Sequence, residues 1–241
     1  MIVVDDCTAD RFVARLATHV SPEERAKVSR YFKTGPGDYG EGDVFAGVRM
    51  RDVFALAKEF VDMPPAEIEA LLESPVHEVR AGALSVMDKA ARRKRTSPAR
   101  RQDLFDLYLR RMDRIDNWDL VDLAAPYVVG GYLFDKPRDV LYELARSANV
   151  WERRTAMLST LYFARQGDLD DIYGVAEVLR ADDHDLIHKA VGGLLREAGK
   201  HDRPRLLAFL DRHAASMPRT MLRYASEHLD RDQRAHYRNL T

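Results

Sequence analysis

The fold is indicated by the segment SPVHEVRAGA at residues 74–83, which returns as SANVWERRTA at residues 147–156 and as DDHDLIHKA at residues 182–190. Each copy begins with a residue that can cap a helix, continues with an apolar residue, and places a basic residue one to three positions before an alanine. The starting positions, 74, 147 and 182, differ by 73 and by 35 residues. Those intervals correspond to two repeats and one repeat of a two-helix unit.

The sequence around these segments also has the periodicity of helices. Apolar residues recur at intervals of three and four throughout residues 53–60, 104–109 and 175–179, and strand-like alternation is absent. Prolines and small polar residues interrupt this pattern at short intervals, several of them where a helix would start. We therefore expect an all-α protein, an α-solenoid of HEAT-like helical hairpins that forms a curved superhelix with a concave groove. The alternative is that these similarities are of the kind that any all-helical protein shows.

The length of 241 residues suits one large domain or two small ones. We expect a single HEAT-like domain over residues 1–241, with an N-terminal helical cap and glycine-rich loop at 1–48 and stacked helical repeats at 49–241. Four glycines fall in the eight residues 35–42, which excludes a helix there. A nucleotide-binding P-loop is not expected, because Lys33 and Thr34 precede the glycines instead of following them. Lys33 and the loop amides could still contact a phosphate.

The composition limits the class of protein. Apolar residues make up 46% and charged residues 32% of the chain, as in a soluble folded protein. The net charge is −1, from 38 basic and 39 acidic residues, so any nucleic-acid surface would be a local basic patch. Cys7 is the only cysteine, which excludes an internal disulfide and a cysteine-based zinc site. Since there is no apolar run of 18 residues and no secretory signal, we expect a cytoplasmic, nucleoid-associated protein. We also expect a monomer without a cofactor.

Two tryptophans are each followed at helical spacing by a charged residue. Trp118 and Asp122 are four residues apart, and Trp151 and Arg154 are three apart, so each pair would share a helix face. Asp122, Arg154 and Lys189 follow one another at 32 and 35 residues, about one repeat each. An acid, a base and aromatic rings would then line one groove, which suits an anionic polymer carrying one cationic site. The alternatives are that the tryptophans fill the core and that Asp122 is the structural partner of an arginine.

Seven basic residues fall within thirteen positions of the chain. They are Lys89, Arg92, Arg93, Lys94, Arg95, Arg100 and Arg101. Such a run is either a solvated surface or the densest site of phosphate contacts in a chain of near-zero net charge. His184 and His188 have the spacing of some zinc ligands, but no third ligand is evident and we expect no metal. His188 instead falls where the repeats place basic groove residues.

Four segments in order carry a resemblance to a known family. They are YFKTGPG at residues 31–37, DNWDLVD at 116–122, WERR at 151–154 and MPRTMLRYA at 217–225. Together they resemble the DNA alkylation repair family, whose best-known members are the AlkD-type alkylpurine DNA glycosylases. The resemblance extends from about Tyr31 to the C-terminus. It implies a HEAT-like superhelix that holds duplex DNA and excises cationic N3- and N7-alkylated purines without full base flipping.

The resemblance also implies roles for individual residues. By motif, the family's aspartate falls on Asp122, its first tryptophan on Trp118 and its backbone-holding arginine on Arg154. A second tryptophan would fall at Gly193, where this chain departs from the family. The residues that we expect to bind DNA are Lys33, Arg92, Arg93, Lys94, Arg95, Arg153, His188, Lys189, Arg219 and Arg223.

The predicted chemistry follows from the charge of the lesion. A purine alkylated at N3 or N7 is cationic, so it can leave its sugar without a proton from a general acid. The enzyme must instead stabilise an oxocarbenium-like deoxyribose, which a carboxylate such as Asp122 can do. The alternative, prompted by Gly193, is a noncatalytic HEAT-repeat protein that binds damaged or branched DNA.

Overall fold

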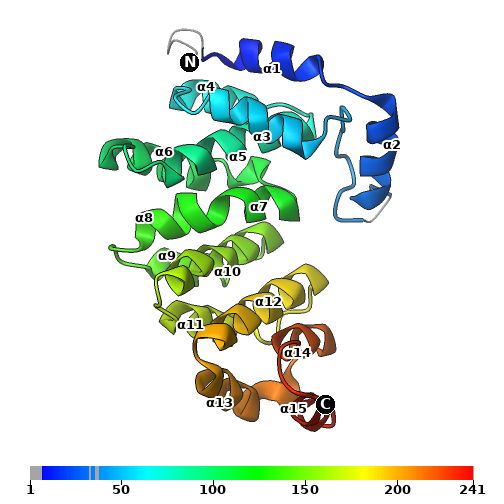
Figure 1. The fold of residues 1–241 in the computed structure, drawn as a ribbon, viewed down its shortest axis with the longest axis vertical. Coiled ribbons are helices and arrows are strands. Elements are labelled where there is room, and N and C mark those ends of the chain that lie inside the picture. The colour runs from blue at the N-terminus through cyan, green and yellow to red at the C-terminus, as the bar shows by residue number, and fades with distance from the viewer. Residues whose placement is uncertain (1–6, 33, 36–37, 241) are drawn as a thin grey trace. The chain divides into compact units, whose positions relative to one another are not determined.

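The computed structural model describes residues 7–32, 34–35 and 38–240, so that Lys33 lies outside the described part. Helices connected by short turns make up this part, and within it no strand is formed, only an isolated bridge between Val44 and Val76. The predicted all-α class is confirmed (Figure 1). In the same residues, no helix is both long enough and apolar enough to cross a membrane.

Close contacts divide the chain into two compact units, Met1–Val128 and Val129–Thr241. The prediction of a single domain, with a boundary after residue 48, stays a prediction. The first unit contains α1 (Ala9–Ala17), α2 (Pro22–Tyr31), α3 (Met50–Glu59), α4 (Pro65–Leu72), α5 (His77–Arg92), α6 (Pro98–Arg110), a 3₁₀ turn (Met112–Arg114) and α7 (Trp118–Ala124). A π-helical segment (Ala125–Gly130) follows, and the second unit then contains α8 (Gly131–Leu133), α9 (Asp139–Leu144), α10 (Val150–Arg165), α11 (Asp170–Leu179), α12 (Asp185–His201), α13 (Arg203–His213), a 3₁₀ turn (Ala214–Ser216), α14 (Arg219–Ala225) and α15 (Arg231–Arg238).

The helices begin where the sequence places prolines and capping residues. Proline occupies the first turn of α2, α4, α6 and α13, where its missing N–H costs no helical hydrogen bond. Ser21 and Ser97 accept hydrogen bonds from the first turns of α2 and α6, and Asn149 and Asp202 do the same for α10 and α13. The expectation that prolines mark helix starts is therefore confirmed at these four helices.

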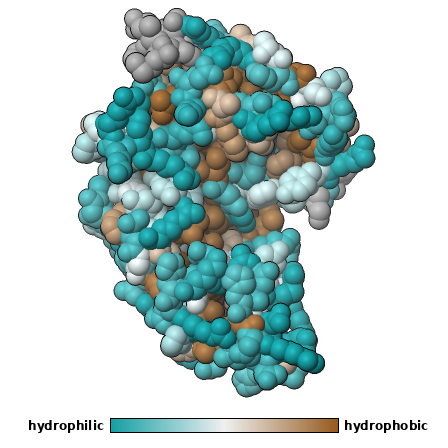
Figure 2. Space-filling view, in the orientation of Figure 1, coloured by the Kyte–Doolittle hydropathy of each residue, from teal (hydrophilic) through white to brown (hydrophobic). Residues whose placement is uncertain are grey.

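In each unit the helices stack in two layers. In the first unit α5 packs against α3 and α7, and α4 and α6 contact both α5 and each other (Figure 1). Nearly all of α5 is buried, including its polar residues His77, Glu78 and Arg80. In the second unit α12 packs between α10 and α14, and α9 contacts α11 in the other layer. Hydrophilic residues cover most of the face seen in Figure 2, as expected when the apolar faces of stacked helices are buried.

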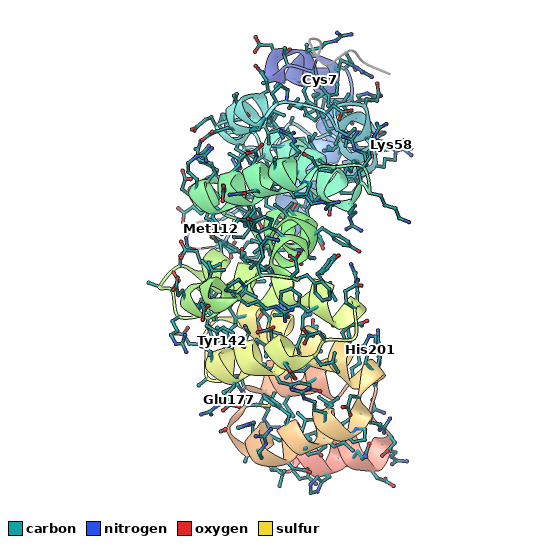
Figure 3. The ribbon with its side chains drawn as sticks, turned by 90° about the vertical axis from the view of Figure 1, so that its left-hand side faces the viewer. Cys7, Lys58, Met112, Tyr142, Glu177 and His201 are labelled. Atoms are coloured by element: carbon teal, nitrogen blue, oxygen red, sulfur yellow. The ribbon has the colours of Figure 1, made fainter. Side chains whose placement is uncertain are left out.

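The second layer of the C-terminal unit is held by side chains that reach from hairpin to hairpin. Tyr142 of α9, labelled in Figure 3, donates its hydroxyl to Asp171 of α11 at 2.8 Å. Gly174 makes room for that ring, because an added Cβ would lie 2.4 Å from the tyrosine oxygen. Glu177 on the same helix pairs with His213 of α13 at 2.8 Å. These contacts give the stacked helices a fixed register.

The repeated sequence segments share a structural feature. The Nη1 of Arg80 donates to the carbonyl oxygen six residues earlier, that of Ser74, at 3.2 Å. Arg153 makes the same return to Ser147 at 3.0 Å. His188 occupies the equivalent place, with its Nε2 2.5 Å from the main-chain oxygen of Asp182. A basic side chain thus closes the turn before α5, α10 and α12 in the same way, which confirms the internal repeat read from the sequence.

Candidate functional site

The predicted site in the N-terminal unit is built on α7. Trp118 is the first residue of this helix, and Asp122 lies one turn further along, so both half-buried side chains share a face. The helix start is fixed by Asn117, whose Oδ1 accepts from the amide of Trp118 at 2.8 Å. The fully buried Asn117 side chain also donates to Asp43 at 2.7 Å. The position of Trp118 is therefore set by a residue that the interior holds in place.

Asp122 stands at an irregularity of the helix. In a regular α-helix its main-chain oxygen would accept from the amide four residues later, but that residue is Pro126, which has no N–H. The helix widens there into the π-helical segment Ala125–Gly130. Such π segments occur often at functional sites. The sequence shows the proline but not the form that the helix takes around it.

The indole of Trp118 lies in an aromatic cluster that we call the α2–α7 cluster: Tyr31, Phe32, Phe45 and Trp118. Phe32 stacks on Trp118 with ring centroids 5.7 Å apart and an interplanar angle of 21°. Tyr31 meets Trp118 edge-on at 6.1 Å, and Phe32 stacks on Phe45 at 5.1 Å. Phe32 and Phe45 are buried, whereas Tyr31 is 66% exposed. The cluster thus extends from the core to the surface, and the half-buried Trp118 contacts a buried ring and an exposed ring.

A buried network of charges surrounds His77, whose ring lies against Phe32 and Phe45. Its Nε2 is 2.8 Å from Asp119 of α7, and its Nδ1 is 3.8 Å from Asp43. Burial disfavours the charged imidazole, but the two carboxylates outweigh burial and raise the pKa of His77 to about 9. Burial likewise opposes the charge on Asp43, yet its contacts with His77 and Asn117 lower the pKa of this carboxyl. His77 is therefore a buried cation at neutral pH that ties α5 to α7.

Two further charged residues of α5 hold the loop ahead of α3. The carboxylate of Glu78 accepts from three consecutive amides, those of Ala46, Gly47 and Val48, at 2.9, 2.8 and 3.2 Å. Gly47 has a φ of +86°, and an added Cβ would lie 2.3 Å from a main-chain oxygen, so the loop requires glycine there. Arg80 bridges Asp43 at 2.8 Å and Asp116 at 3.1 Å. Glu78 and Arg80 consequently hold in place the loop ahead of α3 and the residues just before Trp118.

The predicted site residues of the C-terminal unit lie on α10 and α12. Arg154 is only 6% exposed, and its Nη1 donates to the carbonyl oxygen of Leu186 at 2.8 Å. Its neighbour Arg153 pairs with Asp182 at 2.6 Å. Lys189 pairs with Asp185 of its own helix at 2.6 Å. The two arginines therefore join α10 to the start of α12, and the role predicted for Arg154 at a DNA phosphate stays a prediction.

Three of the predicted site residues occupy the same position in their helices. Asp122, Arg154 and Lys189 are each the fifth residue of their helix, α7, α10 and α12 respectively. The fifth residue of α5 is Ala81. Repeats of the same construction thus carry an acid, two bases and a small apolar residue at one equivalent place. The intervals of 32 and 35 residues in the sequence reflect this equivalence.

Most of the basic run at residues 89–101 is occupied by contacts within the protein. Arg93 forms a two-pronged pair with Asp62, and Arg92 pairs with Asp88 while its guanidinium lies 3.6 Å from the ring centre of Tyr127. Arg100 and Arg101 donate to main-chain carbonyls. Lys94 and Arg95 are exposed in the turn between α5 and α6. The DNA-binding role predicted for this run stays a prediction.

The adjacent glycines of α12 differ in their surroundings. A Cβ on Gly192 would lie 2.4 Å from the carbonyl oxygen of Met221, so this glycine permits close contact between α12 and α14. A Cβ on Gly193, the position of the absent tryptophan, would meet no atom within 4 Å. The two neighbouring glycines therefore differ: Gly192 is required by the contact with α14, whereas Gly193 has space for a larger side chain.

His184, Arg219 and Arg223 differ in their contacts from the residues described so far. His184 caps α12 by accepting from the amide of Leu186, so its Nδ1 has a structural role. Arg219 and Arg223 of α14 line a cavity of about 910 Å³ between α14 and α15.

Tyr31 and Phe32 were not among the residues predicted for the site, although they begin the segment YFKTGPG. The charges around His77 were not predicted either, because they meet only through contacts between residues distant in sequence. The signal that could have found the rings is an aromatic pair at a helix end, followed by a glycine-rich loop.

Comparisons with known proteins agree with this architecture. The model of a family described as "DNA alkylation repair enzyme" matches residues 12–229. A predicted DNA alkylation repair enzyme from Enterococcus faecalis is similar in structure, with a TM-score of 0.70 and 20% sequence identity over 88% of this chain and 98% of that chain. AlkD2 from Streptococcus mutans aligns with a TM-score of 0.50 and 17% identity over 92% of this chain and 100% of that chain. A search of curated proteins found no match. Since the family match covers most of the sequence, the chain belongs to the DNA alkylation repair enzyme family.

Proposed function

We propose that the protein is a DNA glycosylase that hydrolyses the N-glycosidic bond of cationic N3- and N7-alkylated purines in duplex DNA. The observation that supports this proposal best is the pair Trp118 and Asp122 on one face of α7, with the exposed ring of Tyr31 against Trp118. A carboxylate beside aromatic faces suits a sugar that becomes cationic. Membership of the DNA alkylation repair family supports DNA as the substrate. The side chains of α7 support the type of reaction.

The reaction needs little from the protein because the leaving group is activated already. The C1′–N bond breaks, its electron pair neutralises the alkylated purine, and positive charge develops on the deoxyribose. Asp122 stabilises this charge through its field. Water then bonds to C1′ and loses a proton, for which the Asp122 carboxylate is an acceptor. The free base and an abasic strand are the products.

The aromatic side chains have a complementary role in this proposal. The faces of Trp118 and Tyr31 attract a cationic sugar or purine through their ring quadrupoles. Since Phe32 and Asn117 fix the position of Trp118, that attraction costs little reorganisation when the substrate arrives. Recognition at the surface of a helix requires no deep base pocket, which fits capture of the lesion without full base flipping.

The direct test is excision from a duplex that contains one N7-methylguanine, read as strand cleavage after mild alkali. We expect cleavage at the lesion and none in the matched undamaged duplex. Binding of both duplexes with no cleavage of either would contradict the proposed activity.

A second candidate function, a noncatalytic protein that binds damaged or branched DNA, is favoured by Gly193, where no ring is present. The open space at this residue can accept a larger side chain, so Gly193→Trp is a usable variant. If the protein is a glycosylase with one aromatic wall missing, Gly193→Trp should raise the excision rate a few-fold. If the protein is a binder only, neither form will release a base although both bind DNA.

A further inference from the structure

A cavity of about 910 Å³ lies between α14 and α15, and arginine is its main lining residue. Five arginines line it, and they are Arg219, Arg223, Arg231, Arg234 and Arg238. The two carboxylates in the lining are Glu227 and Asp232. Glu227 pairs with Arg196 of α12, so one of these two negative charges is already balanced. In a chain with a net charge of −1, this is a strong local excess of positive charge.

The helix α15 is oriented so that its arginines share the side next to the cavity. Arg231, Arg234 and Arg238 are spaced by three and four residues and form one stripe of the helix. Other positions hold the helix to α13: Tyr237 donates to Asp211 at 2.7 Å, and Gln233 accepts from Arg203 at 2.5 Å. The buried ring of Tyr237 makes this attachment firm. The arginine stripe is therefore a fixed feature of the C-terminal unit.

Like charges at this spacing repel one another, and an anion between the two helices would remove the repulsion. The planar guanidinium group binds phosphate through two parallel hydrogen bonds. The described lining residues include no aromatic side chain, so the cavity offers no surface on which a base could stack. Its volume and its five arginines exceed what one phosphate needs.

We propose that this cavity binds successive phosphodiesters of a DNA strand, independently of base sequence and of damage. Contacts of this kind position a protein on DNA without reading its sequence. The choice of DNA as the polyanion rests on the proposed function, whereas the affinity of the cavity for phosphate groups does not. Arg219 and Arg223 thereby share their role with the three arginines of α15 that line the same cavity.

The test is the salt dependence of binding to an undamaged duplex. The triple variant Arg231→Gln, Arg234→Gln, Arg238→Gln is compared with a control that loses the same charge outside the cavity, Arg180→Gln, Lys200→Gln, Arg212→Gln. We expect the first variant to bind about ten times more weakly at low salt, and its slope of log K against log salt to be smaller by about 1 to 2. The control should retain the slope of the wild type, and melting curves check that both variants are folded.

A third variant with lysine at the same three positions keeps the charge but lacks the planar guanidinium groups. It should retain most of the slope while binding more weakly than the wild type. An unchanged slope in the glutamine variant would overturn the proposal. It would also be overturned if inorganic pyrophosphate bound the wild type but not the glutamine variant while both bound DNA equally, because the cavity would then serve a small anion.

The outcomes for this cavity and for the glycosylase are separable. If the wild type releases no base but its salt slope depends on the α15 arginines, the cavity assignment stands and the proposed activity fails. If excision proceeds while the slope is the same in the wild type and the glutamine variant, the activity stands and the cavity assignment fails.

Discussion

The first turns of α7 and α12 follow the same plan but carry different chemistry. Each begins with a side-chain cap, and each has one of the predicted site residues as its fifth residue, Asp122 in α7 and Lys189 in α12. In α7 this residue follows Trp118, which contacts aromatic rings from α2. In α12 it precedes Gly193, which has open space around its Cα. The repeat thus supplies a scaffold on which the residue at one register is an acid in α7 and a base in α12.

The largest effect is expected for the acid of α7. Asp122→Asn preserves size but removes the negative field, so excision of N7-methylguanine should fall by about 10²-fold or more, equivalent to about 2.7 kcal/mol of barrier. Single-turnover kinetics at saturating protein measure this step. Asp113→Asn, which removes an exposed carboxylate from the turn before α7, serves as the control and should leave the rate unchanged. Equal rates in Asp122→Asn and the wild type would remove Asp122 from the mechanism.

The glycines of α12 form a matched pair for stability. Gly192→Ala should destabilise the protein by about 2 kcal/mol or more, because its Cβ would collide with the main chain of α14. Gly193→Ala should stabilise it by roughly 0.5–1 kcal/mol, since alanine restricts the unfolded chain and meets no atom. Urea unfolding of the two variants measures both changes. Equal effects of the two substitutions would show that the helices do not approach each other as described.

The exposed ring beside Trp118 should contribute to excision but not to folding. Tyr31→Ala removes a side chain that is 66% exposed, so its free energy of unfolding should change little. Its excision rate should fall by about 10-fold if the ring attracts the developing cation. Tyr31→Phe keeps the ring face and should retain the rate. If the phenylalanine variant loses as much activity as the alanine variant, the hydroxyl rather than the ring is responsible.

The last prediction concerns the pH dependence of folding. The pKa of His77 is about 9 in the folded protein and near 6.5 in an unfolded chain, so the folded state holds the proton more tightly. The stabilisation from this proton is fully present below pH 6.5 and is lost as the pH rises through 9. The free energy of unfolding should therefore decrease across this window in the wild type. In His77→Gln the decrease should be absent, and a decrease of the same size in both proteins would contradict this role for His77.

Residues whose partners are close in sequence were the ones that the sequence predicted well. Prolines at helix starts, the repeat interval and the shared face of Trp118 and Asp122 depend on local geometry, and the structure places them as expected. The contact between Tyr31 and Trp118 joins residues 87 positions apart, and no local rule predicts it. The basic run at residues 89–101 was predicted less well. Its charge suits DNA, but Arg100 and Arg101 donate hydrogen bonds to main-chain carbonyl oxygens of other segments, and only the folded chain shows these contacts.

Cleavage of a glycosidic bond by α7 is tested best by the identity of the product. The wild type is incubated with duplex DNA containing N7-methylguanine, and the released small molecules and the strand are weighed by mass spectrometry. We expect free 7-methylguanine and a strand that has lost this base but kept its sugar. A strand in which guanine is restored by loss of the methyl group, or an unchanged strand, would contradict it.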